Sequence, residues 1–305
     1  MSTGQGLSEL TRVPAAAVRR SGKRPWTPRR APVLRLARHG GLYLVLAVGS
    51  VVMIYPFLWM LATSLRSLPD LASAGAGIIP EHWLWSNYSQ ALSSFPFWEY
   101  LGNSLITTII PIVTTVFTSS LAGFAFARIQ VRGTSVLFVI VLATMLLPGE
   151  VTLVPQFVLF RELGMINTLY PLIIPSLFAS PFYIFLFRQF YRRLPESLVD
   201  AAVIDGCGWF KMWWAVFTPL ARPVMMASSV LLFMGYWNNF LGPTIYINSD
   251  RWKTLPMALA GFQSVNSTNT PGLMATTTVM ILPCVILFFF AQRAFLDGVT
   301  FTGGK

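Results

Sequence analysis

The residues best suited to a chemical role lie in one short polar segment between two long apolar stretches. They are Glu196, Asp200, Ala201, Ala202, Asp205 and Gly206. Gly206 can adopt the left-handed conformation that ends a helix, and Glu196 would lie near the positive start of that helix, where a carboxylate is favourable. The small alanines would let another surface approach closely. The segment therefore suits contact with a second protein, and an amphipathic loop at the membrane surface is the alternative.

A second set of polar side chains interrupts or borders the apolar stretches. Its members are Thr107, Glu150, Tyr236, Trp237, Asn238 and Asn239. Aromatic rings can stack on the C–H faces of sugars, and amides and hydroxyls can bond sugar hydroxyl groups, so the set is a candidate translocation pathway. Hydrogen bonding between helices is the alternative, because polar groups inside a membrane usually find a partner. For Glu150, after Pro148 and Gly149, a helix end at the outer interface is the alternative.

Several kinds of catalytic chemistry are absent from the sequence. No G-x-x-x-x-G-K-[ST] phosphate loop occurs, so the chain is not expected to hydrolyse ATP by itself. His39 and His82 are the only histidines, which excludes a histidine-based metal cluster or a Ser-His-Asp triad. No series of acidic residues or histidines lies within the apolar stretches, as a proton-driven pump would require. We therefore predict that the chain is not an enzyme and binds no cofactor or metal.

The elements that carry these residues must be membrane helices. Only 11% of the residues are charged, against about a quarter in soluble proteins, and mean hydropathy is +0.62. A helix that crosses the hydrocarbon core needs about 20 apolar residues. The continuous apolar texture also differs from the alternating pattern of barrel strands. We predict an all-α protein with six transmembrane helices, at 41–65, 102–126, 135–158, 168–189, 222–245 and 272–292.

The distribution of positive charge predicts the orientation of these helices. If the N-terminus is cytoplasmic, 18 of the 22 Lys and Arg residues lie in inside segments and four in outside segments. Positive residues are enriched in cytoplasmic loops, so both termini are predicted to lie in the cytoplasm of a multi-pass plasma-membrane protein. The net charge of +11 is then a signal of topology and not of nucleic-acid binding.

We predict three parts along the chain. Residues 1–40 mix arginines with Pro, Ala and Ser and show no apolar period, which predicts a disordered cytoplasmic tail attracted to anionic membrane lipid. Residues 41–98 hold the first transmembrane helix and an outer loop. Residues 99–305 hold the remaining helices and the polar segment, which extends over 195–217.

The polar segment resembles a known family motif. Asp200-Ala201-Ala202, Asp205-Gly206 and Pro219-Leu220, with Pro219 thirteen residues after Gly206, resemble the EAA loop in permease subunits of ATP-binding-cassette (ABC) importers. That loop reads Glu-Ala-Ala-x-x-x-Gly and is followed by a hydrophobic arm and Leu-Pro. Asp200 replaces the usual Glu, and Thr218 stands where an apolar residue is common before the proline.

Further landmarks resemble the carbohydrate-uptake branch of this family, the maltose-permease-like class, over about 99–305. They are Asn103-Ser104-Leu105, Ala125-Phe126-Ala127-Arg128, Arg132-Gly133, Trp237-Asn238-Asn239-Phe240, Gln292-Arg293, Gly298-Val299-Thr300 and Gly303.

The resemblance implies a type I ABC importer permease fold in which 195–217 forms a coupling helix. That helix would dock on a cytoplasmic ABC ATPase subunit, which uses ATP and Mg. The resemblance also implies a second homologous permease, two copies of the ATPase subunit and an extracytoplasmic solute-binding protein. The sister permease of such importers often holds most of the substrate contacts.

We therefore predict a non-catalytic permease subunit that imports a sugar or related solute. The alternatives are a permease for another cargo, such as a glycerophosphate compound, a polyol or an amino acid, and a secondary transporter that needs no ATPase. A secondary transporter would predict internal repeats or buried ionisable relays, and neither is found in the sequence.

Overall fold

The computed structural model describes residues 32–73, 79–80, 82–262 and 269–300. Most of the predicted basic tail and Gly303 lie outside these residues. Within the predicted tail, helix α1 already begins at Pro32.

The described residues form helices and turns and contain no strand, which confirms the all-α prediction. The helices are α1 (Pro32–Ser64), α2 (Leu68–Ser73), α3 (Ser86–Ser93), α4 (Phe97–Arg128), α5 (Thr134–Ala143), α6 (Gly149–Glu162), α7 (Tyr170–Ile173), α8 (Pro181–Arg192), α9 (Ser197–Ile204), α10 (Trp209–Met212), α11 (Thr218–Leu220), α12 (Arg222–Trp237), α13 (Leu241–Tyr246), α14 (Leu255–Gly261) and α15 (Thr270–Thr300). The described residues also form three short 3₁₀ turns, η1 (Thr144–Leu146), η2 (Ile174–Leu177) and η4 (Asp250–Trp252), and one π-helical turn, η3 (Trp213–Phe217).

Four helical stretches among the described residues are long and apolar enough to cross a membrane: Gly40–Ser64, Phe97–Arg128, Tyr170–Arg192 and Thr270–Gln292. The number rises to six if each of two sharply bent pairs is one span. The pairs are Thr134–Leu146 with Gly149–Glu162, bent by 93°, and Trp209–Leu220 with Arg222–Trp237, bent by 79°.

Three of the predicted spans are not the continuous helices that the apolar runs suggested. The third breaks at Leu147 and Pro148, which have extended ψ angles of 117° and 136°, because proline disfavours helical conformation in the residue before it. The fourth is interrupted between η2 and α8, ahead of Pro181. The fifth ends at Trp237 instead of 245, and the Asn239 side chain accepts the N–H of Gly242 at the start of α13.

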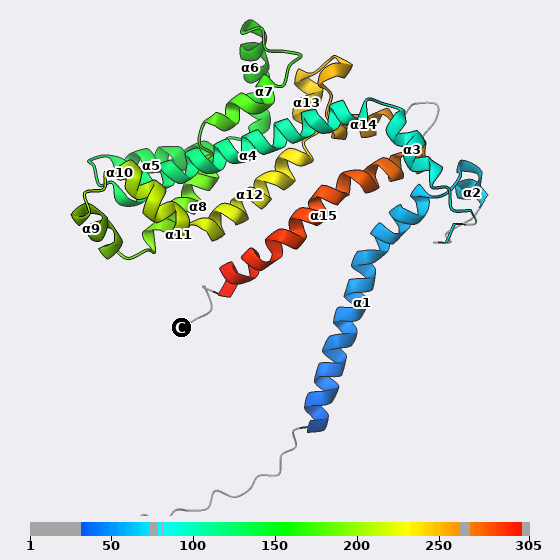
Figure 1. Cartoon of the computed structure of the whole chain (residues 1–305), viewed down its shortest axis with the longest axis horizontal. Coiled ribbons are helices and arrows are strands. Elements are labelled where there is room, and N and C mark those ends of the chain that lie inside the picture. Colours follow the sequence, from blue (N-terminus) through cyan, green and yellow to red (C-terminus); the bar gives the residue numbers. More distant parts are fainter. Residues whose placement is uncertain (1–31, 74–78, 81, 263–268, 301–305) are drawn as a thin grey trace, which may run out of the picture. The chain divides into compact units, whose positions relative to one another are not determined.

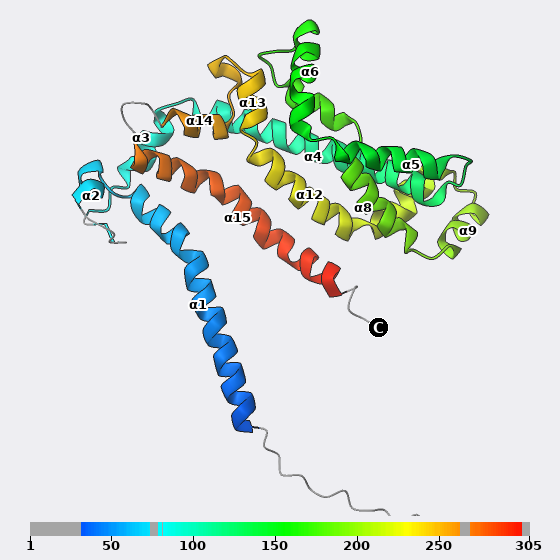
Figure 2. The same cartoon turned by 180° about the vertical axis from the view of Figure 1, so that it is seen from behind.

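Residues 1–54 and 55–305 form two compact units. The described part of the first is the N-terminal portion of α1, whose side chains are exposed from Gly40 to Ile54. In the second unit α4 packs along α8 and α12, and α15 packs along α12 and α3. Figures 1 and 2 show α12 lying between α4 and α15. The second unit is therefore built around α4 and α12.

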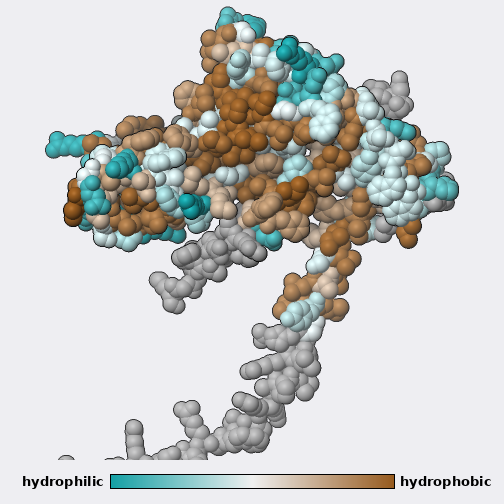
Figure 3. Space-filling view, in the orientation of Figure 1, coloured by the Kyte–Doolittle hydropathy of each residue, from teal (hydrophilic) through white to brown (hydrophobic). Residues whose placement is uncertain are grey.

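The surface of the second unit is the surface of a membrane protein. Large exposed apolar side chains occur along most of its long helices, far more than soluble monomers present. In Figure 3 the hydrophobic surface covers the face over α4, α12 and α15, and hydrophilic residues gather around α9 and around α6. The α9 segment therefore lies at a polar end of the unit.

Candidate functional site

The predicted polar segment forms a short helix with a well-defined end. Helix α9 covers Ser197–Ile204, and Asp200 lies in its first turn. Gly206 has φ of 71°. The N–H of Gly206 bonds the carbonyl of Val203, and the N–H of Cys207 bonds the carbonyl of Ala202, both at 2.9 Å. This pair of bonds is a Schellman cap, so the predicted left-handed glycine at the helix end is confirmed.

The two alanines of α9 differ in exposure. Ala202 is 4% exposed and packs in a core with Met212, Trp213 and Phe217. Ala201 is exposed. The sequence predicted that both alanines let another surface approach closely, but Ala202 is covered by the aromatic arm of this chain, residues 209–217, which follows α9.

A different set of α9 side chains is available to a partner. We call it the α9 surface, and it consists of Asp200, Ala201, Val203, Ile204 and Asp205, all exposed. Val203 is 57% and Ile204 85% exposed, and a carboxylate lies on either side of this apolar pair. Glu196, just before α9, is also exposed. Val203 and Ile204 were not among the residues that the sequence singled out.

The chain segments on either side of α9 are attached to α4. Arg128, the last residue of α4, donates hydrogen bonds from Nη2 to the carbonyls of Tyr191 and Leu194, at and after the end of α8. Its guanidinium also lies 5.2 Å from the ring centroid of Phe217, in the arm that follows α9. A cation at the end of a helix stabilises its free carbonyls. Arg128 therefore connects α4 to the chain segment before α9 and to the segment after it.

Four of the six predicted pathway residues meet at one small cavity. Thr107, Tyr236, Trp237 and Asn239 line it together with Ser104, Leu172, Pro243, Thr254 and Pro256. Its volume is about 10 Å³, which is room for about one water molecule. The cavity joins α4, α12 and the start of α13. It is too small for a sugar in this conformation.

Three of these four side chains also make a hydrogen bond within the protein. The Trp237 indole N–H donates to the carbonyl of Met280 in α15 at 3.0 Å, and the Thr107 hydroxyl donates to the carbonyl of Asn103 at 2.8 Å. Asn239 caps α13 through the bond to Gly242. The interhelical bonding that the sequence left open as an alternative is thus present at Trp237.

The other two predicted pathway residues lie elsewhere. Asn238 is exposed, and its amide donates to the carbonyl of Met234 one turn earlier in α12. Glu150 is exposed in the first turn of α6, beyond the bend after α5. The alternative that the sequence offered for Glu150 was a helix end at the outer interface, and the structure places it at the start of a helix, next to Pro148.

Two motif residues that the sequence linked only to family resemblance have structural contacts. The Asn103 side chain donates to the carbonyls of Arg251 and Lys253, both at 2.9 Å. Ser104 Oγ accepts the N–H of Leu255 at 2.8 Å. These bonds attach η4 and the start of α14 to the first half of α4 and so form one wall of the small cavity.

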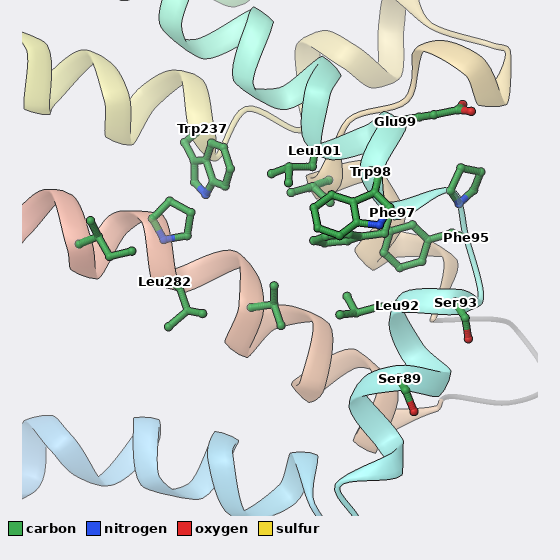
Figure 4. A pocket seen from close by; sticks show the side chains of 15 residues that line it. Ser89, Leu92, Ser93, Phe95, Phe97, Trp98, Glu99, Leu101, Trp237 and Leu282 are labelled. Atoms are coloured by element: carbon green, nitrogen blue, oxygen red, sulfur yellow. The ribbon is translucent and has the colours of Figure 1, made fainter.

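A second cavity, among the residues that the structure describes, has a different character. It has a volume of about 840 Å³ and is lined mostly by apolar side chains from α3, α4, α12 and α15. In Figure 4, Leu92, Trp98, Trp237 and Leu282 surround it, and the carboxylate of Glu99 extends away from this group. Sugar hydroxyls would lose their hydrogen bonds to water there without replacement. The cavity therefore does not suit a polar cargo.

Long apolar helices, with an exposed, capped helix at one polar end, are typical of a multi-pass membrane protein. Residues 115–300 match the family described as binding-protein-dependent transport system inner membrane component. The chain is 33% identical to the arabinooligosaccharides transport system permease protein of Halalkalibacterium halodurans, over 83% of this chain and 92% of that protein. It is 30% identical to a diacetylchitobiose uptake system permease protein of Streptomyces coelicolor, over 84% of this chain and 85% of that protein.

The fold is also similar to a solved structure. A crystal structure of a bacterial ABC transporter involved in the import of the acidic polysaccharide alginate contains a chain that matches with a TM-score of 0.76 and 20% identity. The match covers 88% of this chain and 99% of that chain.

The chain therefore belongs to the family of binding-protein-dependent transport system inner membrane components. This confirms the ABC importer permease class that the EAA-like segment indicated. Membership makes the chain a multi-pass inner-membrane protein and one subunit of a transporter complex.

Proposed function

We propose that this chain is the permease subunit of an ATP-driven importer of oligosaccharides, delivered by an extracytoplasmic solute-binding protein. The relatives named above transport arabinooligosaccharides and diacetylchitobiose, and the similar structure belongs to an importer of alginate. These are different saccharides, so their shared chemistry supports a saccharide cargo and favours no single sugar. A polyol, glycerophosphate or amino-acid cargo finds no support in this group.

The α9 surface is the proposed docking site for a cytoplasmic ATPase subunit. Val203 and Ile204 expose apolar area at a polar end of the molecule, and exposed apolar groups with a polar rim are typical of protein contacts. A short helix that inserts such residues into a groove is a common recognition mode. Asp200, Asp205 and Glu196 would contribute polar contacts around the groove. Because the chain has no phosphate loop, ATP and Mg would be bound by this partner.

The proposed assembly contains a second homologous permease and two ATPase subunits. The small polar cavity lies among α4, α12 and α13 and, at about 10 Å³, cannot hold a sugar, so the proposed pathway needs a second bundle. We propose that a path opens when the segment Asn238–Phe240, between α12 and α13, moves away from α4. Thr107, Tyr236 and Asn239 would then offer hydroxyl and amide groups to the cargo.

The single observation that carries the docking proposal is the exposure of Ile204 beside buried Ala202. The test replaces Ile204 with arginine in the intact complex purified from its native membrane. Since the side chain is 85% exposed, the variant should insert and fold normally. We expect loss of the co-purifying nucleotide-binding subunit and of ATP-dependent uptake of radiolabelled arabinooligosaccharides and diacetylchitobiose.

The matched control is Val131→Arg, at a residue that is 68% exposed in the loop after α4, on the same predicted side of the membrane. It should keep both the nucleotide-binding subunit and uptake. An Ile204→Arg complex that retains its ATPase would remove α9 as the docking site. Transport that persists after ATP depletion would instead favour a secondary transporter.

A further inference from the structure

Three buried polar side chains from separate elements form one hydrogen-bonded group. They are Ser120 in α4, Tyr191 in α8 and Trp213 in η3, and we call them the 120–191–213 node. The Trp213 indole N–H donates to Ser120 Oγ at 3.1 Å, and Ser120 Oγ and Tyr191 Oη lie 2.7 Å apart. Ser120 and Tyr191 are 0% exposed and Trp213 is 1% exposed.

Aromatic rings enclose this node and exclude water from it. The ring centroid of Phe117 lies 5.2 Å from that of Trp213, and the centroid of Phe124 lies 4.9 Å from that of Phe217, both pairs edge to face. A buried hydroxyl or indole N–H that loses its partner in such surroundings has no water to replace it. Separation of the three elements is therefore opposed by hydrogen bonds as well as by packing.

The node lies on the face of α4 that also holds Arg128. Ser120, Phe124 and Arg128 follow one another at intervals of four residues, so they share one side of the helix. Through this side α4 contacts the end of α8, which precedes α9, and the arm η3, which follows α9. A helix held at both of its flanks by the same neighbour can move only together with that neighbour.

The arm itself carries an unusual turn at this point. Residues Trp213–Phe217 form a π-helical turn, and the Thr218 hydroxyl donates to the carbonyl of Trp213 at 2.8 Å. Pro219 has no N–H to give to the preceding turn, and π-helical turns accommodate such a mismatch. The turn holds Trp213 buried against α4 while Trp214 remains 56% exposed.

We propose that α9 and the part of α4 from Val113 to Arg128 move as one rigid body, with the 120–191–213 node as the positioning element. A displacement of α9 by the ATPase then reaches α4, which lines the small polar cavity through Ser104 and Thr107. This inference rests on the proposed function, because it assumes that α9 is the segment that the ATPase displaces.

The test measures the distance between α9 and α4 in the intact complex, reconstituted in lipid vesicles. Spin labels are placed at Ser197→Cys, in α9 but outside the α9 surface, and at Val113→Cys, both exposed, after the native cysteines Cys207 and Cys284 are replaced by serine. The complex is compared without nucleotide and after trapping with MgATP and vanadate. In the otherwise wild-type chain we expect the same distance distribution in both states.

The decisive variant is Trp213→Phe, which keeps an aromatic ring and removes the indole donor. It should shift or broaden the α9–α4 distance distribution on trapping, while the exposed Trp214→Phe control should behave as wild type. If Trp213→Phe fails to assemble, Tyr191→Phe and Ser120→Ala remove one hydroxyl each and carry the same expectation. A merely structural role would lower thermal stability and leave the distance independent of nucleotide.

Two results would overturn the inference: a wild-type α9–α4 distance that changes on trapping, or node variants whose distances match those of Trp214→Phe. The proposed function fails in a different way, because the ATPase is then absent from the complex or vanadate traps no nucleotide in it. That outcome would refute the inference together with the function on which it rests.

Discussion

Gly206 determines where α9 ends and in which direction the chain leaves it. Its φ of 71° lies in the left-handed region, and its N–H and that of Cys207 close the cap on the carbonyls of Val203 and Ala202. A residue with a Cβ atom is disfavoured there. The direction of the aromatic arm, and with it the position of Trp213 against α4, therefore depends on one glycine.

Gly206→Ala is expected to destabilise the purified complex by roughly 1–2 kcal/mol, the cost of left-handed backbone in a residue with a Cβ atom. Gly208→Ala is the matched control, because Gly208 has φ of −70° and ψ of 162° and no atom within 4 Å of an added Cβ. Thermal unfolding in detergent measures both. Equal stabilities for the two variants would contradict the assigned cap.

Ala201 and Ala202 show at the same scale how neighbours in sequence acquire different roles. A helix turns by about 100° per residue, so one alanine faces solvent while the other is 4% exposed. A bulky charge at Ala202 would disrupt the core that holds α9 in place. Loss of uptake in such a variant would therefore not distinguish docking from folding, whereas Ile204 separates the two.

At the scale of elements, α4 and α8 pack tightly against each other at Gly123. A Cβ atom added at Gly123 would lie 2.6 Å from Phe187 Cβ and 3.0 Å from the backbone nitrogen of Arg188. Neither neighbour is the end of a flexible side chain. The two helices can therefore approach to this distance only because position 123 has no side chain.

Gly123→Ala should separate α4 from α8 and destabilise the protein, while Gly102→Ala in the same helix meets nothing within 4 Å. Both substitutions gain similar helix propensity, so the difference between them isolates the packing term, about 1–3 kcal/mol for overpacking. Thermal unfolding of the two variants in one detergent gives this difference. A Gly123→Ala protein as stable as Gly102→Ala would contradict the α4–α8 contact.

At the scale of the whole molecule, the charge distribution predicts that α9 lies in the cytoplasm and the loop around Trp83 outside. Single cysteines at Trp83 and at Val131, both exposed, can be tested with a membrane-impermeant maleimide after Cys207 and Cys284 are replaced. Val131 is on the same predicted side of the membrane as α9 and outside the α9 surface. Intact cells or spheroplasts should label position 83 and not position 131, and permeabilised cells should label both. Labelling of position 131 from outside would reverse the topology and exclude a cytoplasmic ATPase at α9.

Several features could be predicted from the sequence because they depend on local or one-dimensional properties. The length of an uninterrupted apolar run located α1, α4 and α15, since hydrocarbon thickness fixes the length of a membrane helix. The glycine at position 206 and the acidic residues around it located α9 by turn chemistry. Hydropathy does not report changes in the direction of the chain, however. The helix breaks at Pro148 and after Trp237 therefore lie inside spans that we predicted to be continuous.

Only the tertiary structure decided which residues meet. Thr107, Tyr236 and Asn239 line one cavity because α4 and α12 pack together, and Asn238, their sequence neighbour, faces away from it. Ser120 and Trp213 are 93 residues apart and are joined by one buried hydrogen bond. Hydrophobic pattern and turn chemistry act within a few residues, whereas such contacts depend on how whole helices pack, and a single sequence carries no separate record of that packing.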